Sequence, residues 1–168
     1  ECGMPLMPID ELAAAVVRAH AAGLAVAIHA IGDRATRQVV SILADLPSDI
    51  PCPVAPQRIE HVQFIRPTDV TKLGRLPVVA SVQPRHLVDD MAMMPETVGE
   101  RARFAYPFKS LARAGATLAF GSDCPVADPN PFLAIGAAVT RRRPDGLPTG
   151  GWYPAQQLDL VQAVEAYT

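Results

Sequence analysis

The chain has 168 residues, of which 49% are hydrophobic, and its formal net charge is −2. This length suits one domain, and this hydrophobic share is enough to build a buried core. Because the charge is nearly balanced, we expect neither nucleic acid nor a membrane surface as a partner. The apolar runs are too short to span a bilayer, and the first residues show no signal-peptide pattern.

Cysteine usage and the first residue indicate the setting of the chain. Cys2, Cys52 and Cys124 are odd in number and show no Cys-x-x-Cys spacing. This pattern argues against a disulfide framework and a cysteine-based zinc site, so we expect a reducing, cytoplasmic location. The first residue is Glu1 rather than Met, and the natural N-terminus is therefore expected to be processed or to lie upstream.

Helical and strand-like patterns alternate along the chain. The first helix is expected over residues 9–22, with Asp10 and Glu11 in its first turn and Gly23 as its stop. Asp33 is expected to cap the second helix. In chain order, strands are predicted at 24–29, 57–62, 78–83 and 116–121, and the further helices at 34–45, 67–76, 107–114, 131–140 and 158–168.

Two segments are expected to be irregular. Residues 85–106 form the longest stretch without periodicity, which is typical of a lid or a binding loop. The second loop follows residue 140 and contains three consecutive arginines, Arg141, Arg142 and Arg143, which we interpret as a solvated basic run. Trp152 is expected to anchor this second loop.

The alternating pattern predicts an α/β fold with four βα units. Short apolar strands followed by helices are typical of parallel sheets covered by helices on their faces. Four such strands fit either a small doubly wound sheet or half of an eight-stranded barrel. In the first strand, the small residues Ala25 and Ala27 share a face with His29, and the fourth strand repeats this pattern below Asp123. Small residues on one face favour a crowded barrel interior.

Three of the predicted strands end in side chains that can bind a metal. These side chains are His29, His61 and Asp123. In barrels of parallel strands, chemistry gathers at the carboxyl ends of the strands. Two imidazoles and one carboxylate at these ends suggest a divalent metal and an activated water. Each residue also has a structural alternative, namely a core histidine bonded to backbone, or a turn cap for Asp123.

Further polar residues surround the strand ends. Gln83, Arg85 and His86 follow the third strand and are candidates for substrate contact, although His86 also fits a structural loop histidine. Glu60 lies on the opposite face from His61 and needs a partner if it is buried. Arg58 is one candidate for that partner. Alternatively, Glu60 lies behind a metal ligand and orients it.

Other residues are given structural roles. Asp33 is assigned as a helix cap. Asp33 and Glu60 are also candidates for outer residues that support the metal ligands. Ser122 and Cys124 flank Asp123, but no base lies beside either in the sequence, which argues against a nucleophilic role. His20 lies within the first helix and is interpreted as a surface or structural residue. Ile59 shares a face with His61, so the second strand fits the barrel pattern less well.

Four segments carry a resemblance to a known family. They are HAIGDRA at 29–35, RIEHVQ at 58–63, SVQPRHLVDD at 81–90 and GSDCPV at 121–126. Together they resemble the amidohydrolase superfamily, in particular its amidohydrolase 3 branch, over nearly the whole chain. The resemblance implies a (β/α)8 TIM-type barrel hydrolase with one or two divalent metals, usually zinc. It also implies hydrolysis of amide and other C–N bonds in small molecules, including N-substituted formamides and N-acyl amino acids.

The resemblance assigns roles to the strand-end residues. His29 and His61 match the metal-binding histidines after the fifth and sixth barrel strands. Asp123 matches the aspartate after the eighth strand, which binds metal and shuttles a proton. The family's His-x-His pair and carboxylated lysine have no counterpart here, because Lys72 and Lys109 lie in helical segments.

The resemblance therefore makes residues 1–168 one partial barrel domain, equivalent to strands 5–8. An isolated half barrel exposes its edge strands, so we expect either a homo-oligomer or the remainder of a longer chain. The alternative to an enzyme is a catalytically incomplete fragment that folds by self-association. A nucleotide-binding α/β module is disfavoured because the sequence contains no Gly-x-Gly-x-x-Gly and no P-loop pattern.

Overall fold

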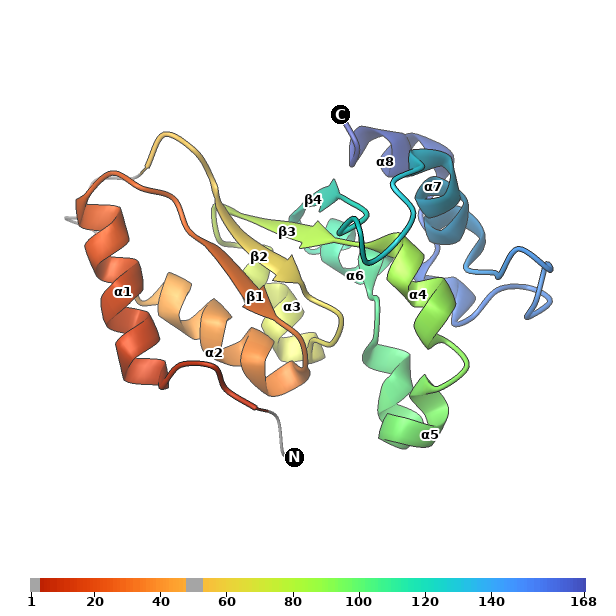
Figure 1. The fold of residues 1–168 in the computed structure, drawn as a ribbon, viewed down its shortest axis with the longest axis horizontal. Coiled ribbons are helices and arrows are strands. Elements are labelled where there is room, and N and C mark those ends of the chain that lie inside the picture. The colour runs from red at the N-terminus through yellow and green to blue at the C-terminus, as the bar shows by residue number, and fades with distance from the viewer. Residues whose placement is uncertain (1–3, 48–52) are drawn as a thin grey trace.

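The structure is a computed structural model that describes residues 4–47 and 53–168. Its strands and helices alternate along the chain, as Figure 1 shows. The strands are β1 (Ala27–Ala30), β2 (Gln57–His61), β3 (Val78–Val82) and β4 (Thr117–Phe120). The α-helices are α1 (Ile9–Ala21), α2 (Asp33–Ala44), α3 (Pro67–Leu73), α4 (Pro84–Asp90), α5 (Met94–Val98), α6 (Phe108–Arg113), α7 (Pro131–Thr140) and α8 (Leu160–Glu165), and the 3-10 helices are η1 (Gly99–Phe104) and η2 (Pro154–Gln156).

The strands form one parallel sheet in the order β1-β2-β3-β4. Helical segments connect each strand to the next, as the alternating sequence pattern predicted. A doubly wound sheet reverses its strand order at a switch point, whereas a barrel wall keeps the chain order. The sequential order therefore selects the barrel wall over the doubly wound sheet.

One face of the sheet is covered by helices and forms the core. Ile28, Ile59 and Ala80 are neighbours across three strands and are all buried. Helix α2 contacts β1 and α6 contacts β4, and α3 lies between these helices. Helix α1 packs outside α2, at the end of the molecule opposite α7 and α8 (Figure 1). The bulky residues of the strands therefore pack against helices, as predicted for a barrel.

The other face of the sheet is open. Ala27 and His29 on β1, Arg58 on β2 and Thr117 on β4 are exposed. Ala27 pairs with Arg58 in the strand register, and Thr117 pairs with Val79 on β3. His29 lies two residues after Ala27 in the same strand and therefore points to the same face. In a closed barrel this face would point to the interior. The predicted small residues thus lie on the side that an eight-stranded barrel would enclose.

The first strand begins three residues later than predicted, at Ala27 rather than at residue 24. The reason is the end of α1, where Gly23 takes a φ of 73°. The Leu24 amide donates to the Ala19 carbonyl and the Gly23 amide donates to the His20 carbonyl. This pattern is a Schellman motif, which satisfies the last helix carbonyls. Leu24 therefore belongs to the helix end and is exposed.

The second helix begins differently from the prediction. Gly32 is the N-cap of α2, and Asp33 is the first residue within the helix. The structure shows no side-chain cap bond at this helix start, so the prediction that Asp33 caps the helix is wrong. The carboxylate instead accepts a hydrogen bond from Arg66 Nε at 2.9 Å. An acidic residue in the first turn still interacts favourably with the helix dipole.

The segment predicted as a long irregular loop is largely helical. It contains α4, α5 and the 3-10 helix η1. Pro84 and Pro95 stand in the first turns of α4 and α5, where a missing amide proton costs nothing. Each helix is too short to display a long apolar period, and for this reason the sequence pattern did not indicate them.

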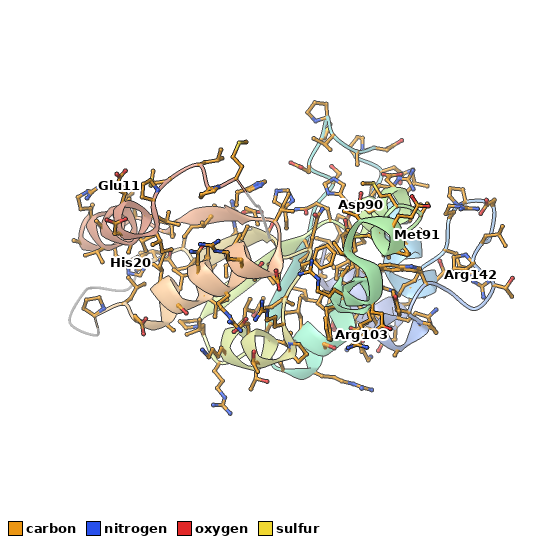
Figure 2. The ribbon with its side chains drawn as sticks, turned by 90° about the horizontal axis from the view of Figure 1, so that it is seen from below. Glu11, His20, Asp90, Met91, Arg103 and Arg142 are labelled. Carbon is orange, nitrogen blue, oxygen red and sulfur yellow. The ribbon has the colours of Figure 1, made fainter. Side chains whose placement is uncertain are left out.

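The structure also corrects the prediction that Arg141, Arg142 and Arg143 form a solvated basic run. Arg141 is fully buried, whereas Arg142 is exposed and lies on an outer loop (Figure 2). Arg141 Nε donates to the Trp152 carbonyl at 2.6 Å, and the Trp152 amide donates to the Arg141 carbonyl at 2.8 Å. Burial lowers the pKa of Arg141 to about 10. The prediction that Trp152 anchors this loop is confirmed, but its partner is the arginine that was expected to be solvated.

Candidate metal centre and active site

The predicted site residues gather at the carboxyl edge of the sheet. His29 lies in β1, His61 ends β2, and Asp123 follows β4. The His29 and His61 rings meet edge to face with 4.4 Å between their centroids. The His61 and His86 rings are stacked with centroids 6.2 Å apart. Parallel strands thus bring together residues that lie far apart in the sequence.

Three ligand atoms form the tightest group. Within the part of the chain that the structure describes, His61, His86 and Asp123 each offer one ligand atom, and these atoms all lie within 4.8 Å of one another. The two histidines are buried and Asp123 is exposed. His29 lies beside this group rather than in it. The sequence placed His86 at the mouth of the site, and the structure brings it closer to the other ligand atoms than expected.

The backbone at two of these residues is unusual. His61 has a φ of 75° and Asp123 a φ of 58°, both in the left-handed region that few non-glycine residues adopt. Val62, which is β-branched, follows with a φ of 46°. The side-chain alternation of β2 therefore ends at His61, and the poor fit of this strand to the barrel pattern has a local cause. Such backbone conformations concentrate at functional sites.

Gln83 orients one of the candidate ligands. It is buried at the N-cap of α4, and its Oε1 lies 2.9 Å from His61 Nδ1. In this arrangement His61 Nδ1 carries the proton and donates it to the amide oxygen, which leaves Nε2 free as a ligand. Gln83 thus contacts a candidate ligand directly, whereas the sequence suggested only a contact with substrate.

The environment of His61 favours its neutral form. Burial is the main cause that lowers the pKa of His61, and the charge of His29 acts in the same direction. The charge of Asp123 and the hydrogen bond that His61 donates to Gln83 partly oppose this shift. Because a metal binds the unprotonated imidazole, a lowered pKa keeps the ligand form available at a more acidic pH.

His86 provides an observation that points to a missing ligand. Its Nε2 is buried and, in the described part of the chain, has no hydrogen-bond partner. Buried polar atoms in folded proteins are almost always paired, with protein groups, water or an ion. His86 belongs to the group with His61 and Asp123. The donor set of two imidazoles and a carboxylate therefore fits a divalent metal such as zinc.

The outer residues are engaged in ion pairs. Arg58 Nε lies 3.0 Å from Glu60 Oε1, so the predicted partner of Glu60 is confirmed. The Asp33 carboxylate is 2.9 Å from Arg66 Nε and 3.8 Å from Arg101 Nη1. It therefore ties α2 to the segment after β2, near the site.

Arg85, expected to contact substrate, pairs with Asp89 one turn further along α4, at 3.2 Å. Its side chain is 23% exposed, so it keeps some access to solvent. The structure thus neither joins Arg85 to the metal-binding group nor buries it in the core.

The remaining candidates lie away from the chemistry. His20 is buried and hydrogen-bonded to Gln57, and Figure 2 shows it far from Asp90 at the end of α4. The structural role expected for His20 is confirmed. Cys124 is free and exposed, whereas Cys2 and Cys52 lie outside the described residues. Among the helices of the described ranges, none has both the length and the apolar character required to cross a membrane.

Comparison with known proteins gives related sequences over the whole chain. A family model described as "Amidohydrolase family" matches residues 2–168. The chain is 38% identical to Protein LONG AFTER FAR-RED 3 of Arabidopsis thaliana, over 99% of this chain and 28% of that protein. It is 26% identical to the putative amidohydrolase YtcJ of Bacillus subtilis, over 99% of this chain and 31% of that protein.

Solved structures give the same picture. An uncharacterized metal-dependent hydrolase from Pyrococcus horikoshii OT3 is similar with a TM-score of 0.83 and 32% identity, over 99% of this chain and 33% of that one. A second, from Pyrococcus furiosus, is similar with a TM-score of 0.81 and 29% identity, over 99% and 32%. The chain thus spans about a third of the length of these relatives. Its four βα units are part of a TIM-type barrel, as predicted.

Proposed function

Since the chain belongs to the amidohydrolase family, we propose that it forms the C-terminal half of the barrel of a metal-dependent hydrolase that cleaves amide or other C–N bonds in a small molecule. The observation that carries this proposal is the convergence of His61, His86 and Asp123 at the carboxyl edge of the sheet, with His29 beside them. The cytoplasmic location expected from the sequence stays a prediction.

Four residues are candidates for holding the metal. A catalytic zinc site keeps three protein ligands and one open position, so one of the four faces the substrate. His61 and Asp123 are selected by the family resemblance and by the geometry alike. We assign the third ligand position to His29, which stands on the neighbouring strand with its ring 4.4 Å from that of His61. His86 then faces the substrate with its unpaired Nε2.

The proposed chemistry is the addition of water across a C–N bond. A bound divalent metal supplies a Lewis acid and lowers the pKa of water toward neutrality. The Asp123 carboxylate accepts the proton of the attacking water and passes it to the leaving nitrogen. Asp123 is exposed after the end of β4, so its carboxylate can reach both the attacking water and the leaving nitrogen. Gln83 keeps His61 in the correct tautomer, while His86 and Arg85 contact the substrate.

The remainder of the barrel is proposed to come from further residues of a longer chain. The open sheet face would then become the barrel interior. Closure by a second copy is the other route, and on either route the closing strand meets an edge of β4 that is partly occupied. The Phe120 amide donates to the Ala166 carbonyl at 2.7 Å, and the Phe120 and Tyr167 rings pack edge to face. On either route the closing strand would have to displace these residues before it could pair with β4.

Metal affinity tests the proposal. The chain is titrated with Zn²⁺ and Co²⁺ by calorimetry after removal of bound metal. His61→Ala and His29→Ala are expected to weaken binding by at least about 100-fold, the upper end of the loss seen for outer-shell changes. His86→Ala is expected to retain the metal. His20→Ala is the matched control, because His20 is also buried and hydrogen-bonded but lies remote from the site.

Three results would change the proposal. A wild-type chain that binds no metal would refute the site. Loss of metal in His86→Ala with retention in His29→Ala would exchange the roles of these two histidines. A panel of N-acyl amino acids and N-substituted formamides, assayed with the longest available form of the protein, tests the substrate class. Cleavage of none of them would refute C–N bond hydrolysis.

A second candidate is a fragment without catalysis that folds by self-association. The open sheet face and the exposed Leu160, Val161 and Val164 on α8 favour it. It predicts a tight oligomer in analytical ultracentrifugation and no turnover on any substrate. A strict monomer that binds metal would refute this candidate and support the hydrolase half.

A further inference from the structure

A buried polar chain links three segments beside the proposed site. Arg141 Nη1 donates to the Tyr106 carbonyl at 2.9 Å, and the Tyr106 hydroxyl donates to Asp90 Oδ2. Arg141 and Tyr106 are buried, with exposed fractions of 0% and 1%. We call Asp90, Tyr106 and Arg141 the clamp. None of these residues is used in the proposed chemistry.

The clamp joins the far ends of two helices that lead to the site. Helix α4 carries His86 in its first turn and Asp90 as its last residue. Helix α7 follows the segment that contains Asp123, and Arg141 is its C-cap. The two helices pack against each other. His86 thus lies at the N-terminal end of α4, and Asp123 precedes the N-terminal end of α7. The clamp holds the C-terminal ends of both helices.

The clamp is more polar than core packing requires. An apolar side chain could fill the position of Tyr106, whose ring packs against Phe108 with centroids 6.0 Å apart. A buried guanidinium is costly unless its donors are paired, and Arg141 Nη2 has no partner among the described residues. Burial raises the pKa of the Tyr106 phenol, so the hydroxyl stays protonated and keeps donating to Asp90. Directional hydrogen bonds of this kind fix orientation, which apolar contacts do poorly.

We propose that Asp90, Tyr106 and Arg141 are positioning residues that hold α4 against α7 and thereby set the placement of Gln83 and His86, at the start of α4, relative to Asp123. This inference rests on the proposed function, because the placement of α4 affects metal binding only if Asp123 holds the same ion as His61, which Gln83 at the N-cap of α4 orients. A rigid support is needed because a site displaced by a fraction of an ångström loses affinity and rate.

Tyr106→Phe tests the clamp with the smallest change, because it removes the hydroxyl and keeps the ring. We expect Co²⁺ and Zn²⁺ affinity to fall by about tenfold, the lower end of the effect of outer supports. In the metal-free protein we expect amide hydrogen exchange in α4 to accelerate by about tenfold, since this helix loses the bond that holds its end. The Co²⁺ absorption spectrum is expected to change in shape, which a purely structural role would not cause.

Two controls separate positioning from general destabilisation. Tyr167→Phe removes a hydroxyl that has no hydrogen-bond partner among the described residues, so metal affinity and exchange in α4 should remain at wild-type values. Val40→Ala lowers stability through a fully buried residue of α2, away from α4. It should lower the unfolding midpoint without changing metal affinity at a temperature well below that midpoint.

The outcomes are distinct. Wild-type affinity and wild-type exchange in Tyr106→Phe would overturn the clamp. If the wild-type chain binds no metal, the proposed function fails, and the exchange rates of α4 still decide whether the clamp holds this helix. If Tyr106→Phe does not fold, Asp90→Asn replaces it, because the amide keeps an acceptor oxygen but loses the charge. An affinity loss of about tenfold in Asp90→Asn, the lower end of the effect of outer supports, would then support the clamp, and wild-type affinity would overturn it.

Discussion

The two faces of the parallel sheet are built from different residues. On the helix-covered face, Ile28, Ile59 and Ala80 lie side by side and are buried. On the open face, His29 and Glu60 are neighbours in the strand register. The first face supplies stability through apolar burial, while the second carries charged and metal-binding groups. The difference indicates that stability and chemistry are separated across one layer of backbone in this protein.

The largest expected effect comes from two adjacent valines of β3. Val78 is 4% exposed on the helix-covered face, whereas Val79 is only half-buried on the open face. Val78→Ala is expected to reduce the free energy of unfolding by about 2–3 kcal/mol, through lost burial and the cavity left behind. Val79→Ala is expected to cost less than about 1 kcal/mol. Urea denaturation of both variants measures the contrast, and equal losses would mean that the open face is covered in solution.

A smaller effect is expected from the ion pair of the open face. Arg58 and Glu60 are 54% and 24% exposed, so water screens the charges. Glu60→Gln is therefore expected to change the free energy of unfolding by less than about 1 kcal/mol, and less still at high salt. Denaturation at low and high ionic strength checks this. A loss above 2 kcal/mol would show that the pair is buried, by the rest of a barrel or by a second copy.

The smallest expected effect is a dependence of folding stability on pH, which arises from His61 at the end of β2. Its pKa is lowered in the folded chain, first by burial and then by His29. The unfolded chain therefore binds more protons just below the ordinary histidine pKa of 6.5. Stability is then complete above that pH and is lost as the pH falls through the lowered value.

Replacing the titrating ring tests this sign. His61→Gln is expected to flatten the fall in metal-free stability between neutral and mildly acidic pH, measured by urea denaturation across that range. Identical pH profiles for the wild type and His61→Gln would contradict the assignment. A wild type that becomes more stable on acidification would contradict the sign.

Much of the architecture followed from patterns that lie close together in the sequence. Alternating apolar strands and helices indicated the parallel units, and Gly23 marked the end of the first helix. The small residues beside His29 indicated which face would point to the barrel interior. These features depend on local backbone preferences and on burial, which neighbouring residues record. The short helices of residues 85–106 escaped detection because none is long enough to show a period.

The details of the site could be predicted only in part. His61 and Asp123 stood out because each ends a predicted strand. His86 was noticed, but its proximity to them depends on a helix start at Pro84, which the sequence pattern did not reveal. The roles of Gln83 and Arg141 depend on partners distant in sequence, His61 at 22 residues and Tyr106 at 35. Contacts between residues so far apart in the sequence produce no periodic pattern from which they could be predicted.

Local sequence patterns were enough to predict the succession of strands and helices along the chain, the sides on which small and bulky residues lie, and the chemistry available at the strand ends. Local conformational preference and hydrophobic alternation carry that information. The tertiary structure decided which ligand atoms meet, which arginine is buried and which edge of the sheet the residues after α8 occupy. These outcomes depend on packing between distant segments and on left-handed turns at His61 and Asp123, where local preference is overruled by the surrounding structure.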